Sequence, residues 1–380
     1  MGVCADDLAA RIKPLFAENF SRFGELGAAV SIWQDGAPLL ELHGGYRDAL
    51  REAPWTQETL VLFWSATKGL GSACLLHVLQ GRAIGLERRV AEFWPEFAQG
   101  GKDQITLAQL LSHQAGLVAL DEAVEVTDYA AVIAALEKQR PLWPPGRAHG
   151  YHARTFGFLL DELVRRIDSR SLGEYWREVF AEPLGLDIWI GLPAEKNACV
   201  ATTYAAKAAN VAPADPFYRA LATSGTLQRQ VFTSPRGLNS VSVMNALENR
   251  AHSFVSFGGI GSATSLGKFY ALLANGGSLG EQRFFSEKTI AQMTTTLAAG
   301  MDRVFLRPTA FSAGFMQDPP DAARRLFGPS TFAFGHPGAG GSHAFADPET
   351  HVSFAYVMNQ MEQKLLPNEK SLRLVDALYG

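Results

Sequence analysis

The sequence predicts an α+β protein in which an antiparallel sheet is built from both ends of the chain and a helical region is inserted between them. Two observations carry this prediction. Strand-like segments bounded by turns occur within residues 28–42 and 331–358, whereas helical spacing dominates from about residue 81 to 250. We therefore predict an α/β domain at 1–80 and 251–380, a mainly helical domain at 81–250, and a functional site between them.

The N-terminal segment predicts a helix followed by a hairpin. Strands are expected at 28–33 and 38–42, on either side of the turn Gln34-Asp35-Gly36. A short apolar run at 59–64 then ends at Ser65, after which helical spacing resumes, so Ser65 lies at the start of a buried helix. The first helix, at 5–22, is indicated by the spacing of Leu8, Ile12, Leu15 and Phe16.

The remainder of the chain follows the same division. Within the inserted region, a turn-rich stretch lies at 143–146, and helices are expected at 106–113, 128–138 and 154–167. Gly-rich or Asp-Pro turns separate three expected strands near the C-terminus, and a last helix follows from about 369 to 378. These strands are placed at 331–335, 342–346 and 352–358.

Composition excludes several classes of function. The chain has 380 residues, 47% of them hydrophobic, and a net charge of -4 without a basic stripe or an acidic tail. It therefore predicts a large buried core and no affinity for nucleic acid or for an anionic membrane surface. No segment reaches membrane-spanning length, and Asp6 and Asp7 interrupt the region where a signal peptide needs apolar residues, which predicts the cytoplasm.

Cysteines and histidines predict neither a disulfide framework nor a metal site. Three widely spaced cysteines, Cys4, Cys74 and Cys199, are expected to be free thiols. His149 and His152 are the closest candidate metal pair, but no His-Glu-x-x-His pattern accompanies them. No metal ion and no cofactor are predicted.

Ser65 and Lys68 are the leading candidate catalytic pair. A serine hydroxyl is a weak nucleophile at neutral pH and needs a base nearby, and a helix brings residues i and i+3 to one face. The apolar run before Ser65 favours a desolvated lysine with a lowered pKa, so Lys68 is expected to be that base. A serine at a helix start also directs backbone N–H groups at developing negative charge, which favours an oxyanion hole.

A Ser-x-x-Lys tetrapeptide alone is weak evidence, because a chain of this length contains roughly one by chance. A second one runs from Ser265 to Lys268, where we predict that Ser265 caps a helix and Lys268 faces solvent. The stretch 276–280 has the letters Gly-x-Ser-x-Gly of an α/β-hydrolase elbow. It follows a predicted helix that is capped by the stretch Asn275-Gly276-Gly277, so Ser278 is predicted to be a turn residue.

Two further motifs follow in chain order. Tyr151 precedes a helix, and a phenol held there near a cation can shuttle a proton, although a packing role is the alternative. His152 is expected to pack beside Tyr151 or to tune it. In His336-Pro337-Gly338-Ala339, the Ala339 N–H can supply a second oxyanion donor, and small residues such as Gly338 let substrate lie against a strand edge. A plain Gly-rich turn is the alternative for this motif.

Taken in order, Ser65-x-x-Lys68, Tyr151-His152-Ala153 and His336-Pro337-Gly338 resemble the motifs of class C β-lactamases, DD-peptidases and above all the family VIII carboxylesterases. The likeness covers nearly the whole chain, and it implies the β-lactamase-like fold, an antiparallel sheet flanked by helices plus an all-helical region. The matching flanking segments are LLSHQAGL at 110–117, PGRAHGYHARTFGFLLDELVRR at 145–166, EPLGLDIWIGLP at 182–193, FGHPGAGGSHAFADPE at 334–349 and FAYVMNQM at 354–361.

The resemblance also implies roles for individual residues. Ser65 is the implied acylated nucleophile, with Lys68 and Tyr151 as the proton-transfer pair. The amides of Ser65 and Ala339 are the implied oxyanion hole, and His336 takes the third-motif position. The residues expected to contact substrate are Trp64, His152, Ala153, His336 and Gly338.

Two departures from the family pattern bear on the substrate. Ala153 stands where such β-lactamases carry an asparagine, so no side-chain amide can hold a lactam's acylamino group. His336 stands where they carry a lysine, and it is at most partly charged near neutral pH. Both changes favour uncharged short-chain esters, small molecules that apolar aromatic side chains can surround. The candidates for that lining, or for the core, are Trp64, Trp143, Phe156, Phe257 and Phe334.

The predicted function is therefore hydrolysis of short-chain carboxylic esters through an acyl-Ser65 intermediate. A β-lactamase or a D-amino-acid peptidase or amidase with the same nucleophile is the alternative, and weak β-lactamase side activity is compatible with the esterase. A catalytically silent binding scaffold is the alternative from another class. The presence of all three motifs argues against the scaffold, since a relic is expected to lose Ser65, Lys68 or Tyr151.

Overall fold

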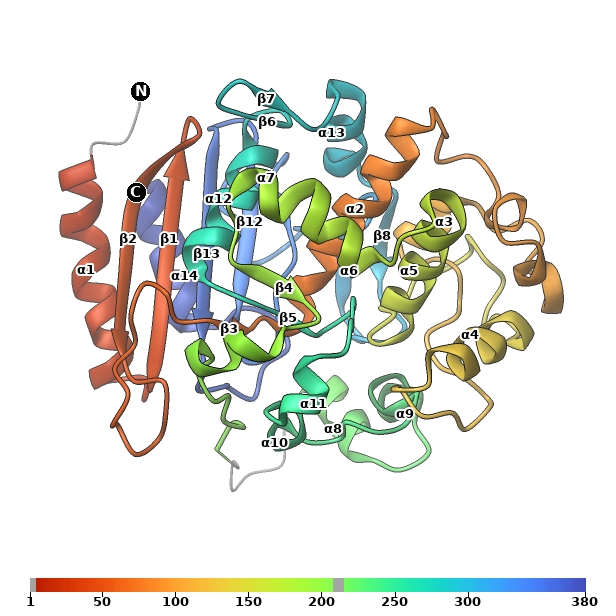
Figure 1. Ribbon diagram of the computed structural model, residues 1–380, viewed down its shortest axis with the longest axis horizontal. Coiled ribbons are helices and arrows are strands. Elements are labelled where there is room, and N and C mark those ends of the chain that lie inside the picture. The colour runs from red at the N-terminus through yellow and green to blue at the C-terminus, as the bar shows by residue number, and fades with distance from the viewer. Residues whose placement is uncertain (1–4, 208–214) are drawn as a thin grey trace.

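The largest sheet is antiparallel and draws its eight strands from both ends of the chain (Figure 1). The structure, a computed structural model, describes residues 5–207 and 215–380. This antiparallel sheet, with strands from both chain ends, confirms the sheet architecture expected from the sequence. In spatial order the strands are β2 (Ala37–Gly45), β1 (Gly27–Gln34), β13 (Val352–Met358), β12 (His343–Asp347), β11 (Phe334–Gly335), β10 (Met316–Gln317), β9 (Pro308–Phe311) and β8 (Ala298–Met301).

The two chain ends meet where β1 pairs with β13. Every residue of β13 is buried, and the register sets Val30 opposite Tyr356. Alternate residues of the pair face different cores, because successive side chains of a strand point to opposite faces. Val30 and Tyr356 belong to one core, whereas Ala29 and Val357 belong to the other. Since both faces are covered, these strands are continuous apolar runs rather than alternating ones.

Helices cover both faces of the sheet. On one face, α1 (Ala5–Ser21) packs against α14 (Glu369–Tyr379), and α1 buries Leu8, Ile12 and Phe16 at the predicted helical spacing. On the other face, α12 (Ala263–Ala274) packs on β1, β12 and β13 (Figure 1). The helices predicted at the two ends of the chain are therefore confirmed.

The inserted region is mainly helical. Helix α2, which begins before this region and ends at residue 81, is almost entirely buried and packs against α5. The helices predicted at 106–113, 128–138 and 154–167 correspond to α3, α4 and α5. The helices of this part of the chain are α2 (Thr67–Gly81), α3 (Leu107–Leu111), α4 (Tyr129–Lys138), α5 (Thr155–Asp168), α6 (Leu172–Tyr175), α7 (Glu182–Leu184), α8 (Pro216–Ala222), α9 (Leu227–Thr233), α10 (Val241–Met244) and α11 (Leu247–Arg250).

A small three-stranded sheet connects the inserted region to the segment before Ser65. Its order is β3 (Val61–Leu62), β5 (Gly259–Gly261), β4 (Ile188–Ile190), and both pairings are antiparallel. Strand β4 lies inside the predicted helical domain, whereas β3 and β5 lie outside it. The domain limits near residues 80 and 250 stay a prediction.

The N-cap prediction for Ser265 is wrong. Ser262 caps α12, because its side chain accepts a hydrogen bond from Ser265 N at 3.1 Å. Ser265 lies in the first helical turn, and its Oγ accepts from Asp187 N at 2.9 Å. Lys268 is half-buried and donates to Leu184 O at 2.7 Å, so it does not simply face solvent. Two serines three residues apart compete for one cap, and the serine that directly follows β5 takes it.

Other features near α12 agree with the sequence in part. Asn275 is the C-cap of α12, as predicted. Ser278 begins the small hairpin of β6 (Ser278–Leu279) and β7 (Gln282–Arg283), after which α13 (Glu287–Thr294) follows. The strands β8 to β10 were not predicted, and β11 is shorter than the strand predicted at 331–335.

Within residues 5–207 and 215–380, no helix is long and apolar enough to cross a membrane. Cys74 and Cys199 are free thiols, as predicted. Burial raises the pKa of the Cys74 thiol well above its ordinary value, so this thiol stays protonated. Cys4 lies outside the described residues.

Candidate active site

The turn that carries Ser65 has an uncommon backbone conformation. Ser65 lies in the 3₁₀ turn Trp64–Ala66, which runs directly into α2. Trp64 has a left-handed φ of 53°, which is costly for a bulky residue and persists only where neighbouring contacts fix it. Thr67 supplies such contacts, because its Oγ1 donates to Trp64 O at 2.6 Å and accepts from Gly259 N at 2.8 Å. The start of the predicted helix is thus hydrogen-bonded to β5 through Thr67 and Gly259.

Lys68 is fully buried beside Ser65. Its Nζ lies 3.4 Å from Ser65 Oγ and donates to the carbonyls of Ala153 and Ser256, each at 2.8 Å. Burial lowers the pKa of the Lys68 amine well below its ordinary value. A neutral amine has two N–H donors and one lone pair. Since the two carbonyls take both donors, the lone pair is left for the Ser65 hydroxyl.

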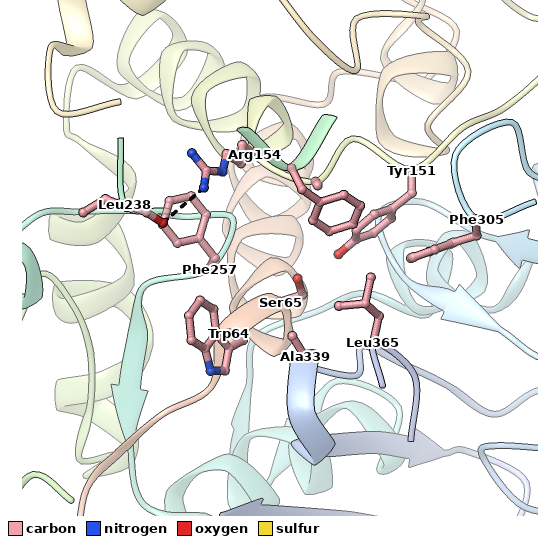
Figure 2. Close-up of a pocket in the computed structure, with 11 residues that line it drawn as sticks. Trp64, Ser65, Tyr151, Arg154, Leu238, Phe257, Phe305, Ala339 and Leu365 are labelled. Carbon is pink, nitrogen blue, oxygen red and sulfur yellow. Dashed lines mark hydrogen bonds between the residues drawn. The ribbon is translucent and has the colours of Figure 1, made fainter. Parts of the chain in front are cut away.

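The phenol of Tyr151 lines the same pocket as Ser65. Figure 2 shows its hydroxyl pointing toward Ser65. Lys68 Nζ lies 4.8 Å from the centroid of the ring. Burial raises the pKa of Tyr151 above its ordinary value, so the side chain is a neutral phenol. A neutral phenol in this place can donate its proton to a neighbouring oxygen.

The third motif reaches Ser65 through Ala339. The two residues line the same pocket (Figure 2), and no group in the described part of the chain accepts a hydrogen bond from the N–H of either. Both amides are therefore available to an oxyanion. Gly338 lies so close to the serine turn that a Cβ on it would come within 2.1 Å of Phe63 O. This close approach brings Ala339 up to Ser65.

His336 and His152 lie behind the pocket wall rather than among its lining residues. His336 donates from Nδ1 to Pro337 O at 2.9 Å, and burial, reinforced by Lys68, lowers its pKa to about 3. His152 accepts from Leu117 N at 3.0 Å through Nε2, and burial lowers its pKa to about 3. Both rings are therefore neutral near pH 7. Of the other predicted substrate contacts, Ala153 and Trp64 line the pocket.

The nitrogens of the candidate metal pair are engaged with protein groups. His149 Nε2 forms a hydrogen bond with Thr309 Oγ1 at 2.9 Å, and His152 Nε2 is the acceptor just described. Across the described ranges, no group of three or more His, Cys, Asp or Glu side chains is placed to hold a metal ion.

The pocket in front of Ser65 is small and apolar (Figure 2). Its volume is about 130 Å³, below the roughly 300 Å³ at which pockets begin to take drug-sized ligands. Among the aromatic candidates from the sequence, Trp64 and Phe257 line it, whereas the others are buried elsewhere: Trp143, Phe156 and Phe334. Further walls come from Phe232, Leu238, Phe305 and Leu365.

Ser256 contributes to the site and was not predicted. Its carbonyl binds Lys68, and its hydroxyl accepts from Gly157 N at 2.6 Å and donates to Arg154 O at 2.8 Å. These bonds fasten the carbonyl to the start of α5. A contact made by a backbone carbonyl leaves no side-chain signal in the sequence.

The sequence matches a protein-family model over nearly the whole chain. The family model described as beta-lactamase matches residues 16–377. The chain belongs to the beta-lactamase family. The family resemblance and the fold predicted from the motifs are therefore confirmed.

Similar members of the beta-lactamase family span almost all of this chain. Esterase/beta-lactamase LipL of Mycobacterium tuberculosis (strain ATCC 25618 / H37Rv) is 31% identical over 376 residues, which cover 95% of this chain and 83% of LipL. A solved penicillin-binding protein homolog from Caulobacter crescentus is 35% identical with a TM-score of 0.88, covering 100% of this chain and 98% of that one. A solved family VIII carboxylesterase is 34% identical with a TM-score of 0.87, covering 99% and 98%.

Proposed function

We propose that this member of the beta-lactamase family is a serine carboxylesterase that cleaves short-chain carboxylic esters through an acyl-Ser65 intermediate. The observation that carries the proposal is the placement of Ser65 Oγ 3.4 Å from the Nζ of Lys68, a buried amine whose pKa burial lowers, at a small apolar pocket. Relatives named as an esterase and as a family VIII carboxylesterase, at 31% and 34% identity, support the same reaction.

In acylation, Lys68 Nζ takes the hydroxyl proton of Ser65 while Oγ bonds to the ester carbonyl carbon. The carbonyl oxygen becomes negative and accepts hydrogen bonds from the N–H groups of Ser65 and Ala339. As the bond between this carbon and the alcohol oxygen breaks, Tyr151 gives its phenolic proton to the leaving oxygen and regains one from the Lys68 ammonium. The alcohol departs, Lys68 and Tyr151 are neutral again, and Ser65 carries the acyl group.

In deacylation, water takes the place of the alcohol. The water oxygen bonds to the acyl carbon while its proton passes through Tyr151 to Lys68. The bond from this carbon to Ser65 Oγ then breaks, and Oγ receives the proton back from Lys68. No carboxylate occurs among the described residues that line the pocket, so we assign the base for this step to the Lys68 and Tyr151 pair.

Covalent labelling tests the nucleophile directly. A fluorophosphonate that carries a reporter is expected to modify Ser65, as read by peptide mapping, and S65A is expected to take up no label. Ser265 and Ser278 are internal controls, since each has a sequence context that resembles a nucleophile's. A label on either of them, or an unlabelled protein, would contradict the proposal.

The close approach of Gly338 to the serine turn gives a second prediction. G338A is expected to lose about 1–3 kcal/mol of stability through overpacking, because the new Cβ would meet Phe63 O at 2.1 Å. The same displacement moves the Ala339 amide, so kcat/KM for p-nitrophenyl butyrate is expected to fall at least about 10-fold. Thermal unfolding and steady-state kinetics measure the two effects.

G81A is the matched control for G338A. Gly81 is the last residue of α2, and a Cβ on it meets nothing within 4 Å. Alanine is the better helix former, so G81A is expected to keep activity and to unfold at the same temperature or a higher one. Wild-type activity in G338A would contradict the proposed placement of the oxyanion hole.

A further inference from the structure

The turn between β8 and β9 contacts Tyr151 in two ways. Asp302, which is 0% exposed, accepts a hydrogen bond from Tyr151 N at 3.3 Å through Oδ1. Phe305, from the same turn, stacks on the Tyr151 ring with centroids 4.6 Å apart and 23° between the planes. One turn therefore contacts both the backbone and the ring of the proposed proton donor.

The carboxylate of Asp302 also fixes the turn itself. Its Oδ1 accepts from Val304 N at 2.7 Å and from Phe305 N at 2.9 Å, and its Oδ2 accepts from Thr309 Oγ1 at 3.2 Å. Burial raises the pKa of the Asp302 carboxyl, and the three amide donors on Oδ1 oppose this rise. The bonds to Val304 N and Phe305 N lie within the turn and cap it. The bond to Tyr151 is additional, and it joins the turn to a segment 151 positions away.

The remaining surroundings of the Tyr151 ring leave it little freedom. His113 lies 5.2 Å from it and His336 lies 5.9 Å from it, measured between ring centroids. With Phe305 stacked on the ring, the direction of the hydroxyl depends on where the backbone of Tyr151 is held. A displacement of about 1 Å in such a group can cost about 100-fold in rate.

We propose that Asp302 is a positioning residue that holds Tyr151, through its N–H and through Phe305, where the phenol protonates the departing alcohol. This inference rests on the proposed function. If Asp302 has this role, its loss affects esters with an alkoxide leaving group and esters with a p-nitrophenolate leaving group differently. An alkoxide has to receive a proton as it leaves, whereas p-nitrophenolate leaves without one. Loss of positioning is therefore expected to penalise ethyl butyrate and to spare p-nitrophenyl butyrate.

Both esters form the same butyryl enzyme and therefore share the deacylation step. Because kcat/KM reports only the steps up to acylation, this shared step does not affect the comparison of the two esters. D302A is expected to lower kcat/KM for ethyl butyrate about 100-fold and for p-nitrophenyl butyrate less than about 5-fold. D302N keeps the size and an acceptor oxygen, so it is expected to restore part of the loss. Y151F is the reference and is expected to separate the two esters in the same direction.

D318A is the matched control. Asp318 is likewise a buried carboxylate that accepts two successive amides, Leu326 N at 2.7 Å and Phe327 N at 3.1 Å. D318A is expected to leave the ratio of the two esters unchanged, even if its unfolding temperature falls. The inference is overturned if D302A lowers kcat/KM for both esters equally, or for neither. Absence of label on Ser65 contradicts the proposed function, whereas normal labelling with an unchanged ester ratio contradicts the role of Asp302 alone.

Discussion

Replacing Lys68 with methionine is expected to lower kcat/KM for p-nitrophenyl butyrate by between about 10²- and 10⁴-fold, the range that a general base supplies. Methionine suits the length and the apolar surroundings of this fully buried side chain, but it has no basic nitrogen for the Ser65 proton. The carbonyls of Ala153 and Ser256 lose their donor, which costs about 1–3 kcal/mol for each unsatisfied group. Thermal unfolding is therefore measured beside the kinetics.

The pH profile reports the charge state of Lys68. Lys68 has to be neutral to accept a proton, so wild-type kcat/KM is expected to fall as pH falls through its depressed pKa. K68M is expected to lack this acidic limb, because it has no such group to protonate.

K268M is the matched control for K68M, from the second Ser-x-x-Lys of the chain. Its amine donates to Leu184 O, away from the pocket, so this variant is expected to keep wild-type kcat/KM and pH profile. Wild-type activity in K68M, or an equal loss in K268M, would contradict the assignment of Lys68 as the base.

The central part of this site could be predicted because it depends on local spacing. An i, i+3 pair at the start of a buried helix places Lys68 beside Ser65, with Lys68 fully buried and Ser65 half-buried at the pocket. The same pattern at Ser265 and Lys268 also lies in a buried helix, but there Ser265 Oγ accepts from Asp187 N and Lys268 donates to Leu184 O. The motifs at Tyr151 and His336, and not the tetrapeptide itself, distinguish the two.

The supporting contacts could not be predicted, because they join distant segments through atoms without a sequence signature. Ser256 acts through its carbonyl, and Asp302 lies in a stretch whose letters indicate only a turn. The strands β8 to β10 were missed for a related reason. They are two to four residues long, and β8 exposes most of its residues at the sheet edge, so no alternation develops.

The cation nearest to a charged substrate in this pocket is already bound to protein carbonyls, and this determines the second large effect. Among the described residues that line it, the only cationic side chain is that of Arg154. Its guanidinium donates to the carbonyls of Pro235, Gly237 and Leu238 at 2.7, 2.8 and 3.2 Å. His336, where β-lactamases of this type carry a lysine, is neutral because burial lowers its pKa to about 3. A carboxylate placed here would lose hydration, and Arg154, three of whose five N–H donors already bind carbonyls, would compensate it only in part.

We therefore expect kcat/KM for p-nitrophenyl butyrate to exceed that for nitrocefin by about 10³-fold or more, the scale on which an unpaired polar group discriminates between substrates. Nitrocefin carries a carboxylate, and Ala153 provides no amide for its acylamino group. Nitrocefin methyl ester, in which the charge is masked, separates the two causes. If charge dominates, opening of its β-lactam ring is faster than in free nitrocefin. If the missing amide dominates, both are opened equally slowly. Comparable values for nitrocefin and the butyrate ester would instead favour a β-lactamase.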